Sequence, residues 1–254
     1  MGSLGNIRIV AFDFFGTLAR NGVEDWGPPL ARIVEKQGFP FTAETLWTEW
    51  RKYEVTFRGS RTNMDDPPSS PPFRSYWEAW RDAFADTFAT LGVSGDPDEA
   101  ATVCVDSHCT RNAFPEVTQA LDALQAYPLA VLSNADDRFL DGSIAHNGWS
   151  FDPVLSSESA KAYKPDPRIF QEFCRIAGVE PHQVLYVGDS PYDDAHGAKL
   201  AGMSTVLVNR SGAPVARPGQ TPPPGQSPIP VSTALLAPDY VVETLAKLAP
   251  LLRA

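Results

Sequence analysis

The sequence has few of the residues that cross-link a chain or carry it into a membrane. Three cysteines occur among 254 residues and none forms a Cys-x-x-Cys pair, so neither a disulfide framework nor a zinc site is expected. No run of about 18 apolar residues is present, which predicts no membrane-spanning helix. The first residues lack the regions of a signal peptide, and Asn6 departs from the myristoylation pattern. We therefore expect a cytoplasmic protein.

Positive charge is also scarce. Lysine and arginine number 21 against 31 acidic residues, and the formal net charge is -10. Nucleic acids and anionic membranes attract basic surfaces, so neither is expected as a partner. A small anionic substrate is still compatible with this charge, because one or two local cations can dominate the field inside a cleft. We expect a monomer or homodimer that acts on a small molecule.

Short apolar runs that end in polar residues mark the predicted strands of a parallel sheet. The runs are residues 7–12, 129–132, 184–187 and 205–208. Helical patterns at 116–126, 167–177 and 194–201 alternate with the later runs, which predicts an α/β, Rossmann-like core. Asp13, Ser133 and Asp189 stand at or beside the ends of three runs. Ligands of open parallel sheets bind at those ends, so these residues are candidates for function.

The stretch from Arg20 to Arg111 has a different pattern. It is rich in predicted helix and holds five of the six tryptophans. Since it separates the first strand from the second, we interpret it as an α-helical cap domain inserted into the core. The predicted division is 1–19 and 112–254 for the core and 20–111 for the cap. Aromatic residues at helical spacing are expected mainly to form the core of the cap, and a few could line an apolar pocket.

Two proline-rich stretches interrupt these patterns. Residues 65–72 contain four prolines and are predicted to form a loop between cap helices. Residues 213–230 contain seven prolines and no apolar period, which indicates a surface loop that is mobile or polyproline-like. A partner-binding role is the alternative for this loop.

Four short segments carry the residues suited to chemistry. In order they are Asp13-Phe14-Phe15-Gly16-Thr17, Ser133-Asn134, Lys164-Pro165, and Gly188-Asp189-Ser190 with Asp194. Taken singly, each could be a turn, a helix cap or a solvated lysine. Together, at strand ends and in this order, they resemble the four motifs of the haloacid dehalogenase (HAD) superfamily of hydrolases, with a helical cap of the C1 type.

The resemblance implies a covalent mechanism. Asp13 would be the nucleophile, because a carboxylate can attack phosphorus or carbon and form an aspartyl intermediate. Lys164 and Ser133 would be catalytic partners that hold a transferred phosphate. The residues expected at the substrate are Gly16, Thr17, Asn134 and Arg51.

The resemblance also implies a Mg²⁺ cofactor. Mg²⁺ prefers hard oxygen ligands, and the expected set is Asp13, the carbonyl of Phe15, Asp189 and Asp194. Asp193 is a less favoured substitute for Asp194, because the spacing from Asp189 and the following Gly197-Ala198 match the family at Asp194.

Phe15 departs from the pattern of most HAD phosphatases, which have a second Asp at this position. That Asp transfers a proton, a contribution worth about 10²–10⁴-fold in rate. The first explanation is a phosphatase whose leaving group needs little protonation, or whose cap supplies the acid, with Glu24, Asp25 and His108 as candidates. The second is a 2-haloacid dehalogenase, because halide leaves without a proton. The third is a silent member that only binds a ligand.

The first and fourth motifs point in different directions. Phe15 makes motif one dehalogenase-like, and the stretch from Trp50 to Tyr53 resembles the dehalogenase cap, so Arg51 or Arg58 could meet a substrate carboxylate. Dehalogenases of this family are metal-free, whereas Asp189 keeps the metal ligand and makes motif four phosphatase-like. We therefore favour a Mg²⁺-dependent phosphatase that acts on a small phosphate monoester. Phosphonate hydrolysis is less favoured, because no motif supports Lys36 or Lys52 as its Schiff-base lysine.

Overall fold

The core of the protein is a parallel sheet covered by helices. The computed structural model describes residues 4–212 and 218–253. Six strands are hydrogen-bonded in the order β3-β2-β1-β4-β5-β6, and every neighbouring pair is parallel. The strands are β1 (Ile9–Phe12), β2 (Leu129–Ser133), β3 (Val154–Ser156), β4 (Val184–Gly188), β5 (Ser204–Val208) and β6 (Tyr240–Val242). The predicted α/β core is confirmed, and β3 and β6 are edge strands that the sequence analysis did not find.

The central strands are apolar on both faces because helices cover both. All residues of β1 and β4 are buried. Along β1, Val10 and Phe12 join one hydrophobic cluster, while Ile9 and Ala11 join the other. This alternation is the two-residue period of a strand. Burial of both faces explains why these strands lack the polar alternation of a sheet that faces water.

The core helices follow the predicted alternation only in part. They are α5 (Val117–Asp122), α6 (Asp137–His146), α7 (Ser157–Ala160), α8 (Pro167–Ala177), α9 (Gly197–Leu200) and α10 (Leu248–Arg253). Helix α8 has the predicted bounds, whereas α5 ends earlier than predicted. The helix predicted at 194–201 is split, because Pro191–His196 is a π-helical segment ahead of α9. Such segments occur often at functional sites.

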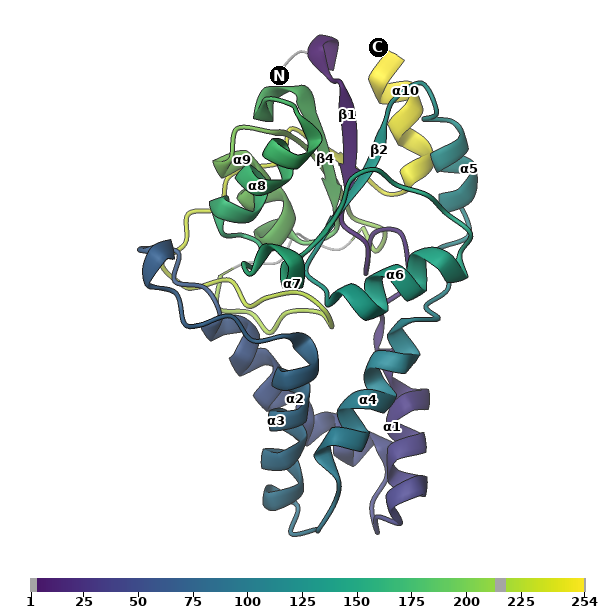
Figure 1. Ribbon diagram of the computed structural model, residues 1–254, viewed down its shortest axis with the longest axis vertical. Helices are drawn as coiled ribbons and strands as arrows, with labels where there is room; N and C mark the ends of the chain where they lie inside the picture. The colour runs from purple at the N-terminus through teal and green to yellow at the C-terminus, as the bar shows by residue number, and fades with distance from the viewer. Residues whose placement is uncertain (1–3, 213–217, 254) are drawn as a thin grey trace.

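Four long helices form the lower half of the molecule in Figure 1. They are α1 (Val23–Gln37), α2 (Ala43–Ser60), α3 (Tyr76–Thr90) and α4 (Pro97–His108). Trp26 packs against Trp50 and Trp80 with ring centroids 5.0 and 5.4 Å apart, and Trp50 stacks on Phe84. The tryptophans thus form the core of this helical half, as predicted. The domain boundaries given above stay a prediction.

The proline-rich loop before β6 is packed rather than loose. Residues 213–217 lie outside the described residues, so the prediction is compared only from residue 218 onward. There Pro222, Ser227 and Ile229 are buried. The segment lies between the sheet and the cap helices (Figure 1). The predicted surface loop is therefore partly buried, although residues 219–221, 223 and 230 are exposed. Among the described residues, no helix is both long and apolar enough to cross a membrane; the cytoplasmic location stays a prediction.

Candidate active site

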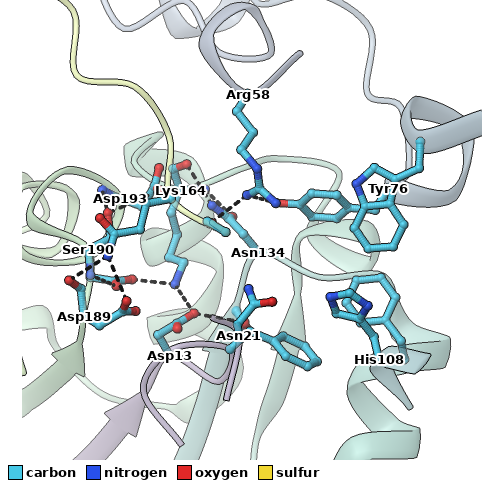
Figure 2. Close-up of a pocket in the computed structure, with 17 residues that line it drawn as sticks. Asp13, Asn21, Arg58, Tyr76, His108, Asn134, Lys164, Asp189, Ser190 and Asp193 are labelled. Carbon is cyan, nitrogen blue, oxygen red and sulfur yellow. Dashed lines mark hydrogen bonds and ion pairs between the residues drawn. The ribbon is translucent and has the colours of Figure 1, made fainter. Parts of the chain in front are cut away.

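The polar residues that end neighbouring strands meet around Asp13. Asp13 follows β1, which lies between β2 and β4 in the sheet. The Ser133 hydroxyl at the end of β2 donates to Oδ1 of Asp13 over 3.0 Å. The Thr17 hydroxyl lies 3.3 Å from Oδ2 of Asp13 and 3.3 Å from Oδ1 of Asp189. The parallel order of the strands therefore places Asp13, Ser133 and Asp189 at one edge of the sheet; Figure 2 shows Asp13 and Asp189 close together there.

Lys164 is the cation of this cluster. Its side chain is 1% exposed, and Nζ donates to Oδ1 of Asp13 over 2.7 Å and to Oδ1 of Asp194 over 2.6 Å. The Tyr186 hydroxyl lies 2.7 Å from the same Nζ. Burial acts to lower the pKa of Lys164, but the charges of Asp13 and Asp194 outweigh it and raise the pKa well above its usual value. Lys164 therefore carries a positive charge beside Asp13 at neutral pH.

The two acidic residues of the fourth motif have perturbed protonation. Burial, together with the charge of Asp13, raises the pKa of Asp189 to about 6 and that of Asp194 to about 8. Contact with Lys164 acts in the opposite direction on Asp194, but burial outweighs it. The carboxyl cluster thus carries less negative charge at neutral pH than its composition indicates.

The predicted metal ligands do converge, but protein donors already engage them. Oxygens of Asp13, Asp189 and Asp194 lie within 4.8 Å of one another. Four of the six carboxylate oxygens accept hydrogen bonds from donors of their own, and the other two, Oδ2 of Asp13 and Oδ1 of Asp189, share the single hydroxyl proton of Thr17. The donors are Thr17, Ser133, Lys164, the Ser190 amide and Gln226. The Lys164 ammonium thus supplies positive charge between Asp13 and Asp194, where the predicted metal ion would otherwise supply it.

Several other predicted residues serve the site indirectly. Asn134 accepts from the backbone N–H of Lys164 over 2.8 Å and donates to its carbonyl over 3.1 Å, so it fixes the backbone of the lysine. Gly16 has φ +102, and a Cβ there would lie 2.6 Å from Oδ2 of Asp189. Only glycine fits this turn, because both its conformation and its space exclude a side chain.

A cavity of about 30 Å³ lies above Asp13, with the cap forming its far wall. Arg58, Tyr76, Trp80 and His108 line it from the cap helices. The other lining residues are Asp13, Phe15, Asn21, Ser133, Asn134, Phe139, Lys164, Asp189, Ser190, Asp193, Asp194, Gly225 and Gln226. In Figure 2, His108 and Tyr76 lie on one side of Asp13, and Asp189, Ser190 and Asp193 lie on the other.

Arg58, rather than Arg51, is the arginine that reaches this cavity. It is buried, and Nη1 donates to the Tyr76 hydroxyl over 2.8 Å, while Nε pairs with Glu54. Arg51 is absent from the cavity lining; it pairs with Glu54 and donates to the Pro222 carbonyl over 2.8 Å. The two arginines were alternatives for a contact with a substrate carboxylate, and of the two only Arg58 lines the cavity.

Of the three cap residues considered as acids, only His108 lines the cavity. Its Nδ1 lies 2.8 Å from the Cys104 carbonyl, an arrangement in which Nδ1 carries the proton and donates. Burial, with the nearby charge of Arg111, lowers the pKa of His108 well below its usual value. The imidazole is therefore neutral and cannot serve as the predicted acid at neutral pH. Glu24 and Asp25 are not part of the cavity lining.

Asp193 is a functional candidate that the sequence analysis ranked below Asp194. It is 3% exposed, lines the cavity and accepts from the Ser227 N–H through Oδ2 over 2.9 Å. Among the described residues, its buried Oδ1 has no hydrogen-bond partner, although Arg61 Nη2 lies 4.0 Å from it. The pair of adjacent acidic residues, Asp193 and Asp194, was visible in the sequence, but the π-helical backbone determines the direction of each side chain.

The comparisons with known proteins establish the family. Residues 7–202 match the model of the haloacid dehalogenase-like hydrolases, and residues 162–248 match a second model, HAD-hydrolase-like. The chain therefore belongs to the haloacid dehalogenase-like hydrolase family, as the motifs predicted, and is a hydrolase.

Several relatives that match most of this chain are named as dehalogenases. The chain is 28% identical to (S)-2-haloacid dehalogenase 4A of Burkholderia cepacia, covering 82% of this chain and 86% of that one. It is 29% identical to (S)-2-haloacid dehalogenase of Pseudomonas sp. (strain YL), covering 85% and 88%. The structure of L-2-haloacid dehalogenase from Xanthobacter autotrophicus with chloropropionic acid covalently bound is 27% identical, with TM-score 0.74 over 98% and 99% of the chains.

These findings correct the predicted activity and cofactor. The Mg²⁺-dependent phosphatase acting on a phosphorylated substrate is wrong, because the similar proteins across most of this chain are 2-haloacid dehalogenases. The Mg²⁺ prediction is wrong with it. The error came from treating Asp189 as a metal ligand, whereas its carboxylate accepts hydrogen bonds from Thr17 and Gln226.

Proposed function

We propose that the protein is a 2-haloacid dehalogenase, a hydrolase that replaces the halogen at C2 of a short 2-halocarboxylate with a hydroxyl group. The observation that carries the proposal is the pairing of Asp13 with Arg58 across a small cavity that Phe15 lines in place of a proton donor. A halide leaving group needs no proton, so Phe15 fits this reaction. The printed names of the similar proteins support the same reaction and favour the (S) substrate.

Arg58 is the group that binds the substrate carboxylate. Its described hydrogen bonds use Nε and Nη1, so Nη2 is the edge available to a ligand. Burial acts to lower the pKa of Arg58, but the charge of Glu54 outweighs it and raises the pKa above its usual value. A permanent buried guanidinium that can bind a carboxylate orients C2 toward Asp13.

In the first step, Asp13 attacks C2 of the substrate. Oδ1 accepts from Ser133 over 3.0 Å and from Lys164 over 2.7 Å, whereas Oδ2 has only the 3.3 Å contact with Thr17. Oδ2 is therefore the freer nucleophile. An Oδ2–C2 bond forms while the carbon–halogen bond breaks, and the halide leaves with the bonding electrons. Phe15 and Phe139 line the cavity, and the positive edges of aromatic rings favour an anion.

In the second step, water hydrolyses the ester. We assign the activation of this water to Asp193, whose buried Oδ1 has no hydrogen-bond partner among the described residues. Asp193 takes a proton from water as the water oxygen attacks Cγ of Asp13. Lys164 and Ser133 stabilise the negative charge that develops on Oδ1. The bond from Cγ to Oδ2 then breaks, and the product alkoxide takes the proton held by Asp193 to become the hydroxyl group. The carboxylic acid re-formed on Asp13 releases its proton to solvent, which restores the nucleophile.

Halide release from (S)- and (R)-2-chloropropionate, with and without EDTA, tests the proposal. We expect chloride release that prefers the (S) isomer and does not change with EDTA, and none from Asp13→Asn. In single turnover in H₂¹⁸O, the label should appear in the peptide that contains Asp13, because the product oxygen comes from that carboxylate. Wild-type protein that releases no halide from any short 2-haloacid would contradict the proposal.

A further inference from the structure

A turn of the proline-rich loop forms part of the wall of the active site. Residues 222–227 belong to the core connection between β5 and β6, yet they lie between the sheet and the cap (Figure 1). Pro222 and Ser227 are buried there. Gly225 and Gln226 line the cavity above Asp13. The loop is thus a third source of residues near the reacting groups, beside the cap helices and the strand ends.

Arginines of cap helix α2 hold the main chain of this turn. Arg51 Nη2 donates to the carbonyls of Pro222 and Pro223 over 2.8 and 2.9 Å. Arg58 Nη1 donates to the carbonyl of Gly225 over 2.7 Å. Because hydrogen bonds from a charged donor are among the stronger ones in proteins, these contacts fix the distance between the turn and the cap.

The core holds the other side of the turn. Gln226 Nε2 donates to the carbonyl of Asp189 over 3.1 Å and to its Oδ2 over 2.8 Å. The backbone N–H of Ser227 donates to Oδ2 of Asp193 over 2.9 Å. The turn is therefore anchored to the fourth motif as well as to the cap, and its position is fixed with respect to Asp13.

There is little room beside the turn. Gly225 has φ +82, and a Cβ at this position would lie 2.3 Å from Nδ2 of Asn21, which also lines the cavity. The guanidinium of Arg58, to which we assign the substrate carboxylate, is bonded to the Gly225 carbonyl. A substituent on C2 of the substrate must therefore fit between the aromatic side of the cavity and this turn.

We propose that Gly225 and Gln226 determine specificity, and that the Gln226 side chain sets the largest C2 substituent that the enzyme accepts. This inference rests on the proposed dehalogenation, which places the substrate carboxylate at Arg58 and C2 at Asp13. It assigns the proline-rich loop to substrate selection. The enzyme then accepts chloroacetate and 2-chloropropionate better than 2-chlorobutanoate and longer homologues.

The kinetic test compares kcat/KM for chloroacetate, 2-chloropropionate and 2-chlorobutanoate in wild type and Gln226→Ala. In Gln226→Ala, kcat/KM for 2-chlorobutanoate divided by kcat/KM for chloroacetate should rise about tenfold, the effect expected when a pocket gains room for one methylene group. The matched control is Gln220→Ala, since Gln220 belongs to the same loop but is exposed and absent from the cavity lining. An unchanged ratio in Gln226→Ala would overturn the inference.

A binding test separates this inference from the proposed function. Calorimetry measures the Kd of acetate, propionate, butyrate and valerate for wild type and Gln226→Ala, and it needs no turnover. We expect affinity to fall with chain length in wild type and to fall less in the variant. Equal chain-length dependence in both proteins would overturn the inference even if halide is released. Absence of halide release with the expected binding pattern would overturn only the dehalogenation.

Discussion

At the scale of single residues, Phe15 is the most informative side chain in the site. It lines the cavity beside Asp13 and packs against His108 and Phe139 at centroid distances of 5.5 and 5.4 Å. The Phe15 side chain therefore forms part of an apolar wall and does not transfer a proton. Phe15 has no group that can take a proton from water, and burial lowers the pKa of His108 and makes its imidazole a weak base. Asp193 takes that proton in the proposed mechanism.

The first prediction concerns Asp193→Asn. We expect ester formation to continue and ester hydrolysis to slow by about 10²–10⁴-fold, because the amide cannot take a proton from water. The ester on Asp13 should accumulate, and mass spectrometry of the peptide that contains Asp13 should detect the added acyl group. His108→Gln is the control and should not accumulate it. Accumulation in the His108 variant but not in Asp193→Asn would reverse the assignment.

At the scale of elements, helix α2 decides which arginine serves the substrate. Arg51 and Arg58 are seven residues apart, which is two helical turns, so they share one face. Both pair with Glu54, three and four residues away. The periodicity alone could not distinguish them. Position along the helix does, because Arg58 lies at the end of α2 that meets Tyr76, Gly225 and the cavity.

The second prediction therefore compares Arg58→Leu with Arg51→Leu. Loss of Arg58 should raise KM for 2-chloropropionate and lower kcat/KM by about 10²-fold or more, since one charged partner of the carboxylate is worth about 3 kcal/mol. Loss of Arg51 should have a much smaller effect, because Arg51 contacts the loop and Glu54. Arg58→Lys should restore part of the affinity. Equal loss in the two leucine variants would contradict the assignment of Arg58.

At the scale of the whole molecule, Asp136 links the cap to the core. Its carboxylate, at the start of α6, accepts from the backbone N–H groups of Tyr76 and Trp77 at the start of α3 over 2.7 and 2.8 Å. Burial raises the pKa of Asp136 to about 7, although these two hydrogen bonds act to lower it. The junction above the cavity therefore contains a carboxyl group that stays protonated at mildly acidic pH.

The third prediction concerns pH-dependent stability. A carboxyl group whose pKa is higher in the folded state binds more protons there than in the unfolded chain. Its contribution to the free energy of unfolding thus falls as pH rises between its model value of 3.8 and about 7. The slope is up to about 1.4 kcal/mol per pH unit. Asp136→Asn should remove this slope.

Urea unfolding of wild type and Asp136→Asn at pH 5.0 and 6.5 measures that contribution as a difference between the two proteins. Subtracting one protein from the other removes the contributions of groups that titrate in both. These groups include His108, whose lowered pKa makes the free energy of unfolding rise with pH. The variant should lose less stability than wild type between the two pH values. Parallel changes in both proteins would show that Asp136 titrates normally.

The sequence by itself determined the family and the parallel core, and it predicted Asp13 as the nucleophile. These features depend on local patterns: apolar runs define buried strands, and the residues that end them meet because parallel strands finish at one edge. Asp13, Ser133 and Asp189 converge for that reason, and Lys164 reaches them from the loop between α7 and α8. The sequence also showed that position 15 has no proton donor. This made a halide leaving group, which needs no proton, one of the predicted alternatives.

Only the tertiary structure decided which side chains complete the site. The choice of Arg58 over Arg51 depends on where α2 meets the core, and the exposure of Asp193 to the cavity depends on a π-helical segment that helical periodicity does not predict. Gln226 enters from a loop whose composition indicated only an irregular surface segment. Hydrogen bonds between residues far apart in the chain fix all three positions, and such contacts leave no periodic signal in the sequence.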